Sequence, residues 1–287
     1  AIPFLTHRTE IRPEVLSYLF LSLFLFFIWQ HRQGKNLGRL YWIFPILQLL
    51  WVNSHVFFIL GPALLILLWI EEKFTKPATL FPIQWIVLTA AISLINPFFI
   101  EGAVTPLFIL KDYGYQLAEN QSVWFMYKRF HDFYLVYFAA TGALGVSALF
   151  MAMIATKSWR RFIFDIGTYS AFLGLAALIN RTTTLWGIVL VGGLSIHSHL
   201  IVQQLPNSLK IKIPKLLAVL ATLLIMMGLF WNQPLFNPFN PNTGFGLIPD
   251  IEKSAQFFKS FNLKGPIFNN YDIGGYLIYE LPQEKVF

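Results

Sequence analysis

The stretch "VLSYLFLSLFLFFIWQ", residues 15–30, decides the fold class of this protein, because none of its side chains is charged. An α-helix needs ~20 predominantly apolar residues to cross a bilayer, and this run approaches that length. The whole chain has the same character, with 56% hydrophobic and 12% charged residues among 287. Soluble globular chains carry about 25% charged residues. The sequence therefore predicts an integral membrane protein.

The apolar runs predict an α-helical multi-pass membrane protein with about seven or eight membrane segments. Residues Asn53, Ser54 and His55 separate the second segment from the third. Both of these segments are shorter than a full span, so we interpret them either as a tight hairpin or as a half-helix followed by a span. The segments run over Val15–Gln30, Leu40–Val52, Val56–Ile70, Leu80–Ile95, Phe133–Thr156, Phe162–Leu178, Thr184–Val202 and Leu216–Trp231.

The distribution of Lys and Arg predicts which loops share a side of the membrane. Eleven Lys and Arg residues lie in one set of loops, 31–39, 71–77, 157–161 and 203–215. Six lie in the alternating set, 1–14, 53–55, 96–132 and 180–183. Cytoplasmic loops carry the excess of Lys and Arg, so the first set is predicted to be cytoplasmic. The same count predicts that the C-terminal tail is extracytoplasmic, and the expected localisation is the inner (plasma) membrane.

The C-terminal residues predict the start of a small soluble α/β unit. Residues 251–264 have a helical apolar pattern, and "PIFNN" (266–270) and "KVF" (285–287) are typical of short strands. Between the strands, Asp272 is the expected N-cap of a second helix. The predicted domains are therefore a membrane helix bundle over residues 1–231 and an extracytoplasmic α/β segment over residues 232–287. Because the chain begins with Ala1 and stops within a predicted strand, we expect a fragment truncated at both ends.

Polar side chains that could bind a substrate concentrate in the less basic set of loops. In "HRTEIRPE" (7–14), Arg8, Glu10 and Arg12 form either a phosphate clamp or a solvated helix cap. Asn53 and His55 lie between two apolar segments, where a polar group has a partner or a function. Arg181 lies in a short turn between two helices and either reaches the membrane surface or faces an anion. The predicted substrate-binding residues are Arg8, Glu10, Arg12, Asn53, His55 and Arg181.

Several classes of site and partner are not expected. The chain has no cysteine, and His197 and His199 are two residues apart, so they point to nearly opposite faces of a helix. We therefore expect no metal site and no cofactor. The net charge of +7 is explained by membrane topology, so nucleic acid is not an expected partner. The expected partner is the lipid bilayer.

A set of motifs spread along the chain resembles the GT-C type multi-pass membrane glycosyltransferases. The likeness is to bacterial proteins with a mannosyltransferase-like membrane core and a C-terminal α/β extension. The motifs are "RPEVLSYLFL" (12–21), "LLWVNSHVFFILG" (49–61), "INPF" (95–98), "NRTTTLWG" (180–187) and "FNNYDIGGYLIYELPQEKVF" (268–287).

The resemblance implies a polyprenyl-phosphate-sugar donor and sugar transfer, by a hexosyltransferase, on the non-cytoplasmic face. The catalytic acid of this family lies in the first outer loop, which has no counterpart here, so the catalytic residue is unknown and is expected in a missing N-terminal segment. The six substrate-binding residues above would face the lipid-linked donor. The alternative is a transporter or flippase, or a non-catalytic multi-pass membrane protein.

Overall fold

The computed structural model describes residues 12–35, 37–76, 80–108, 120–131, 134–206, 251–269 and 271–286. The chain divides into two compact units, 1–215 and 216–287. The predicted segment Leu216–Trp231 and the predicted domain boundary at 231 both lie outside the described residues.

The first unit is a bundle of α-helices whose bounds follow the apolar runs of the sequence. Each of the first seven predicted segments coincides with a helix, and the polar residues Asn53–His55 form the break between α3 and the next helical turn. In the described part of the chain, short 3-10 turns precede four of the helices, at Gly38–Trp42, Val56–Ile59, Arg160–Phe162 and Asn180–Thr182. The helices are α2 (Glu14–Arg32), α3 (Ile43–Val52), α4 (Leu60–Thr75), α5 (Ile83–Ile92), α6 (Phe99–Phe108), α7 (Val123–Phe130), α8 (Tyr134–Thr156), α9 (Ile163–Leu178) and α10 (Thr183–Gln203).

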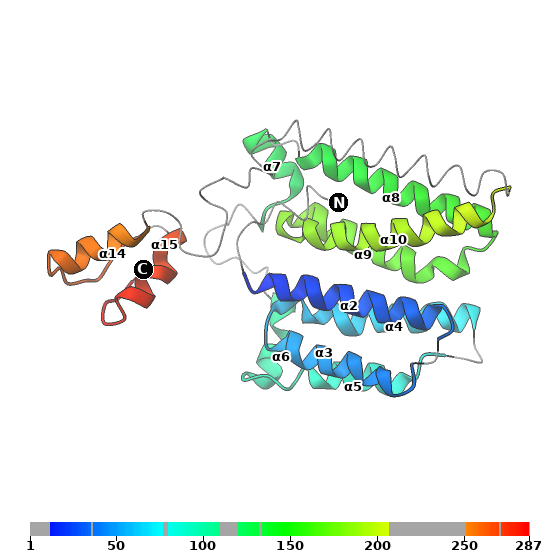
Figure 1. The fold of residues 1–287 in the computed structure, drawn as a ribbon, viewed down its shortest axis with the longest axis horizontal. Helices are drawn as coiled ribbons and strands as arrows, with labels where there is room; N and C mark the ends of the chain where they lie inside the picture. The colour runs from blue at the N-terminus through cyan, green and yellow to red at the C-terminus, as the bar shows by residue number, and fades with distance from the viewer. Residues whose placement is uncertain are drawn as a thin grey trace. The chain divides into compact units, whose positions relative to one another are not determined.

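Helices α2 and α4 lie side by side in the middle of this bundle (Figure 1). Helices α3 and α5 pack on one side of them, and α8, α9 and α10 on the other. Successive helices run back and forth, so the connections collect at two ends. Side-chain bonds join Arg32 to Glu71 and Asp165 at one end, and Arg181 to Glu14 at the other. The described residues of the basic loops 31–39, 71–77 and 157–161 thus share one end, as the charge count predicts.

Among the residues that the structure describes, four helices are long and apolar enough to cross a membrane: Glu14–Arg32, Leu135–Thr156, Arg160–Leu178 and Asn180–Gln203. The 19 residues of α2 would span about 28 Å, close to the thickness of a hydrocarbon core. Three further apolar helices in the described part of the chain are shorter, at Gly38–Val52, Ile83–Ile92 and Phe99–Phe108. The described residues thus form a helical protein with four candidate spans.

Large aromatic side chains fill the core on both sides of α2 and α4. Phe24 and Phe44 lie 5.3 Å apart between α2 and α3, and Phe24 also contacts Trp51 at 5.7 Å. Tyr169 of α9 meets Trp186 of α10 edge-on at 5.2 Å. Offset and edge-to-face pairs of this kind add about 0.5–1.5 kcal/mol each beyond the apolar area they bury. These contacts fix the rotation of each helix, and so determine which polar groups face inward.

The described part of the second unit contains two helices, α14 (Ile251–Ser260) and α15 (Tyr271–Glu280). They enclose a small core of Ala255, Leu277 and Leu281. Ile267 and Val286 form a single parallel bridge, and no longer strand is found in the part of the chain that the structure describes. The expectation that Asp272 caps the second helix is wrong, because the helix begins at Tyr271 and Asp272 falls inside its first turn.

Candidate functional site

The turn between α9 and α10 places one cation at the end of the bundle opposite the basic loops. Asn180–Thr182 form a 3-10 turn, anchored by the Asn180 amide, which donates to the Gln121 carbonyl at 2.8 Å. The Thr182 and Thr183 hydroxyls bond to carbonyls of the same turn, at Ile179 and Asn180. The backbone is thereby held in a fixed conformation, and the Arg181 side chain projects from it.

Arg181 is positioned by groups from three other parts of the fold. Its Nη1 donates to Asn120 Oδ1 at 3.3 Å, and its Nη2 lies 3.7 Å from Glu14 Oε2. The guanidinium carbon lies 5.8 Å from the centre of the Phe57 ring. The Arg181 side chain keeps 21% of its surface exposed, whereas the Glu14 side chain keeps 4%. The carboxylate therefore holds the cation from inside the protein while part of the guanidinium remains accessible.

A second polar chain lies next to this pair and ends at His55. The Trp51 indole N–H donates to Ser17 Oγ at 2.8 Å, and Ser17 Oγ lies 3.0 Å from His55 Nδ1. Because Ser17 accepts from Trp51, its own hydroxyl proton is available for Nδ1, which then accepts as part of a neutral imidazole. Neutral imidazole carries its proton on Nε2, so His55 offers a donor there.

Burial, followed by the positive charge of Arg181, lowers the pKa of His55 to about 4. His55 lies in the connection after α3, outside the four candidate spans. Lowering of a histidine pKa means that the folded protein favours the neutral ring. His55 is therefore uncharged at neutral pH, and Arg181 carries the positive charge of this pair.

We predict that this end of the bundle is sensitive to acid. Since the folded pKa of His55 is about 4 and its ordinary value is 6.5, the unfolded chain binds the extra proton first as the pH falls. Stability is thus lost progressively from about pH 6.5 to about pH 4. Thermal unfolding in detergent micelles across this range would measure it. His55→Gln should flatten the profile, and parallel profiles for both proteins would contradict the role of His55.

The Glu14–Ser17–His55–Asn120–Arg181 group, called the Arg181 cluster below, adjoins a small apolar pocket. The pocket has a volume of about 130 Å³, with Arg181 and Asn120 among its lining residues. The rest of the lining is mostly aliphatic or aromatic and includes Val56, Phe57, Ile59, Leu60, Leu175, Ile179 and Leu185. A guanidinium beside an apolar slot can hold a phosphate while the slot receives hydrocarbon.

The structure brings only some of the predicted substrate-binding residues together. His55 and Arg181 belong to one cluster, since the Arg181 charge acts on the His55 ring. Asn53 instead donates to the Leu49 carbonyl within α3 and to the Ile95 carbonyl, so one of its bonds joins the end of α3 to the residues that follow α5. The Arg12 carbonyl accepts from the Val15 amide in the approach to α2. Arg8 and Glu10 lie outside the described residues.

Sequence reasoning missed Glu14, Ser17 and Asn120 as parts of the cluster. Glu14 is 3% exposed and faces Arg181, although it was not among the predicted substrate-binding residues. The available signal was a carboxylate at the start of an apolar span, where an ionisable residue calls for a partner. The position of Ser17 one helical turn later on α2 gave no such signal.

The opposite end of the bundle holds a buried ionic network that connects four helices. Arg32 Nε donates to Glu71 Oε1 at 2.8 Å, and Arg32 Nη2 donates to Asp165 Oδ2 at 2.6 Å. His197 Nε2 lies 3.4 Å from Asp165 Oδ1. The Glu71 carboxylate also accepts from the Phe164 amide at 3.0 Å. We call Arg32, Glu71, Asp165 and His197 the Arg32 network.

The Arg32 network includes a histidine that the sequence analysis set aside. His197 is fully buried and faces Asp165, whereas His199 is exposed and contacts Gln203 at 2.9 Å. The two rings thus point to different faces, as predicted. Among the residues that the structure describes, no group of three or more His, Asp or Glu side chains could hold a metal ion.

No protein family, curated protein or solved structure matches this chain. The case for a function therefore depends on the geometry of the two bundle ends.

Proposed function

We propose that the protein is a GT-C type integral membrane glycosyltransferase that binds a polyprenyl-phosphate sugar at the Arg181 cluster. The observation that carries the proposal is the position of Arg181 at an apolar pocket of about 130 Å³, at the bundle end opposite the basic loops. The donor has the same two parts, a phosphate and a hydrocarbon chain. In this proposal the cluster lies on the non-cytoplasmic face of the plasma membrane, as does the C-terminal unit.

Each member of the cluster has a role in this proposal that follows from its contacts. Arg181 binds the donor phosphate and stabilises the negative charge that grows on it as the sugar leaves. Glu14 and Asn120 keep the guanidinium in place. Neutral His55 donates from Nε2 to a phosphate or sugar oxygen, and Ser17 fixes its orientation. The group that activates the acceptor hydroxyl is not assigned.

We predict that Arg181→Gln weakens binding of a polyprenyl phosphate by about ten- to a hundredfold. A hydrogen bond from a charged group contributes about 1.5–3 kcal/mol, and each 1.4 kcal/mol is a factor of ten in affinity. Titration of the purified protein in detergent micelles would measure the dissociation constant. The unphosphorylated polyprenol should bind equally weakly to the wild type and the variant, because the arginine recognises the phosphate.

Arg129→Gln is the matched control for this experiment. Arg129 lies in the last turn of α7, is exposed, and belongs to the same set of less basic loops as Arg181. The same charge is removed, so a non-specific electrostatic effect would appear in both variants. Equal losses in the two variants, or equal binding of phosphate and alcohol by the wild type, would contradict the proposed donor site.

Catalysis is tested separately, by incubating the protein with polyprenyl-phosphate sugars and measuring release of polyprenyl phosphate.

The Arg32 network favours a second candidate function, because ionisable residues buried inside a membrane bundle often belong to transport pathways. Donor binding without sugar release, together with movement of a labelled polyprenyl phosphate across vesicle membranes, would support a flippase instead of an enzyme.

A further inference from the structure

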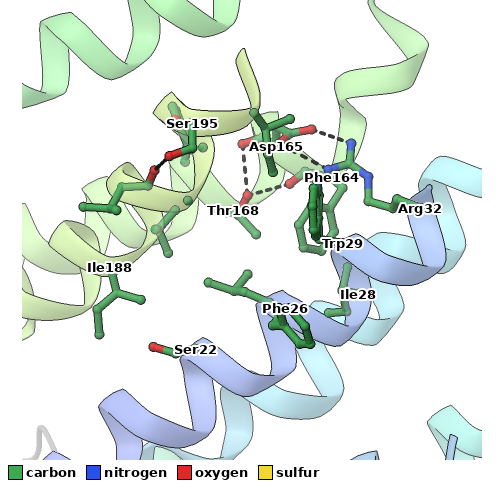
Figure 2. Close-up of a pocket in the computed structure, with 17 residues that line it drawn as sticks. Ser22, Phe26, Ile28, Trp29, Arg32, Phe164, Asp165, Thr168, Ile188 and Ser195 are labelled. Carbon is green, nitrogen blue, oxygen red and sulfur yellow. Dashed lines mark hydrogen bonds and ion pairs between the residues drawn. The ribbon is translucent and has the colours of Figure 1, made fainter. Parts of the chain in front are cut away.

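A large apolar pocket lies among α2, α9 and α10, away from the Arg181 cluster. Its volume is about 480 Å³, within the range of about 300–1,000 Å³ that is common for ligand pockets. Figure 2 shows its labelled residues, with Phe26 and Trp29 on α2 and Ile188 and Ser195 on α10. Arg32 and Asp165 close one end of it, joined by their ion pair.

The polar end of this pocket continues into a second pocket of about 870 Å³. Residues common to the linings of both are Trp29, Arg32, Asp165, Ser195 and Ile196. The second pocket is more polar, and Lys76, Arg161 and His199 belong to its lining. Together the two pockets provide an apolar chamber along the spans and a polar chamber at the helix ends.

Three carboxylates line the polar chamber, but each is already bound within the protein. Arg32 donates to Glu71 and Asp165, and His31 Nε2 lies 2.8 Å from Glu72 Oε1. The Phe164 and Phe81 amides donate to Glu71 and Glu72 respectively. The cations on the rim of this chamber are Lys76 and Arg161, and they are held less tightly than the carboxylates. Lys76 Nζ donates to the Arg32 carbonyl, a neutral group, and the Arg161 side chain is exposed.

The rim charges and the long apolar chamber fit one class of ligand. We propose that the two pockets form a single site for an anionic phospholipid of the membrane leaflet nearest Arg32. One acyl chain lies between α2 and α10, and the phosphate lies between Arg161 and Lys76. Bilayer lipids present chains at the depth of the spans and phosphates at the helix ends. Basic residues at the membrane surface favour anionic lipids.

The glycines of α10 show where a side chain can close the apolar chamber. A Cβ atom at Gly192 would meet no other atom within 4 Å, although Gly192 belongs to the lining of the chamber. A Cβ atom at the next residue, Gly193, would collide with the buried Tyr169 ring. Gly192→Leu therefore fills the chamber without displacing the core. Gly174 on α9 also faces open space but lies outside the lining, so Gly174→Leu is its matched control.

Trp29 serves as the reporter because it is common to both linings. Phosphatidylglycerol with brominated acyl chains, added to the purified protein in detergent micelles, quenches nearby indoles. The fluorescence of the Trp29→Phe variant comes from the other eight of the nine tryptophans, so subtracting it from the wild-type fluorescence gives the contribution of Trp29. We expect saturable quenching of Trp29 that Gly192→Leu abolishes and Gly174→Leu leaves intact.

The head-group part of the site is tested by Arg161→Gln and Lys76→Gln. Each basic residue near an anionic surface contributes about 1 kcal/mol, so each variant should lower the affinity for brominated phosphatidylglycerol about fivefold. Brominated phosphatidylcholine, with the same chains, should bind more weakly and respond little to either variant. Equal quenching by the two lipids, or Gly192→Leu binding as the wild type does, would overturn the proposal. Because Arg161 and Lys76 are exposed, their variants remain informative if Gly192→Leu fails to fold.

Discussion

Arg32→Ala is expected to destabilise the protein by about 3–5 kcal/mol, enough to reduce sharply the yield of folded protein. The guanidinium bonds to Glu71 Oε1 at 2.8 Å and Asp165 Oδ2 at 2.6 Å, and the carboxylate-bearing side chains are only 6% and 7% exposed. Removing the cation leaves two carboxylates buried next to each other without their counter-ion. Thermal unfolding in detergent micelles, followed by tryptophan fluorescence, would measure the loss.

Two further variants separate this mechanism from a general effect of lost charge. Arg160→Ala removes an exposed cation at the same end of the bundle, so it should leave the unfolding temperature nearly unchanged. Combining Arg32→Ala with Glu71→Gln and Asp165→Asn should restore part of the stability, because neutral amides cost less to bury than unpaired carboxylates. If Arg32→Ala unfolds at the wild-type temperature, Arg32 does not neutralise the buried acids.

Most of the bundle could be predicted because apolar length is a local property of the sequence. The predicted segment Val15–Gln30 corresponds to α2 (Glu14–Arg32), and Phe133–Thr156 corresponds to α8 (Tyr134–Thr156). The number of full crossings could not be predicted in the same way. Helices such as α3 and α5 have 10 residues each, and their short apolar runs also suit partial or tilted segments.

The composition of the Arg181 cluster could be predicted only in part. The alternation of helices puts His55 and Arg181 at one end of the bundle, so the charge count was enough to group them. The position of Ser17 in the cluster depends on how α2 is rotated in the bundle. The position of Asn120 depends on where the connection before α7 packs against the bundle. Those features come from contacts such as Phe24 with Trp51, which join residues distant in sequence.

The Arg32 network was missed because charge counting treats a cation at a helix end as a solvated loop residue. Arg32 is the last residue of α2, and its side chain is 16% exposed because it turns toward α4 and α9. The pair Glu71–Glu72, at the end of an apolar run, was the signal that could have identified it. Two adjacent acids beside a span need cations or backbone amides if the helices pack together.

Trp51→Ala is expected to cost about 3–5 kcal/mol, the range for truncating a large aromatic side chain in a core. Trp51 is fully buried, and its ring lies 5.8 Å from Phe20 and 5.7 Å from Phe24. Its indole N–H also donates to Ser17 Oγ, so the variant loses the bond that connects α3 to the His55 chain. Thermal unfolding in detergent micelles would measure the change.

The controls for Trp51 distinguish the packing of its ring from its hydrogen bond. Trp51→Phe keeps an aromatic ring but no donor, so it should cost about 1 kcal/mol beyond any effect of its smaller volume. Trp159→Ala removes an indole that is 58% exposed and should change the unfolding temperature little. Helix α3 has 10 residues, so the result tests whether a helix too short to span alone is held in the bundle by its buried ring. Similar unfolding temperatures for Trp51→Ala and Trp159→Ala would show that α3 does not pack against α2 as described.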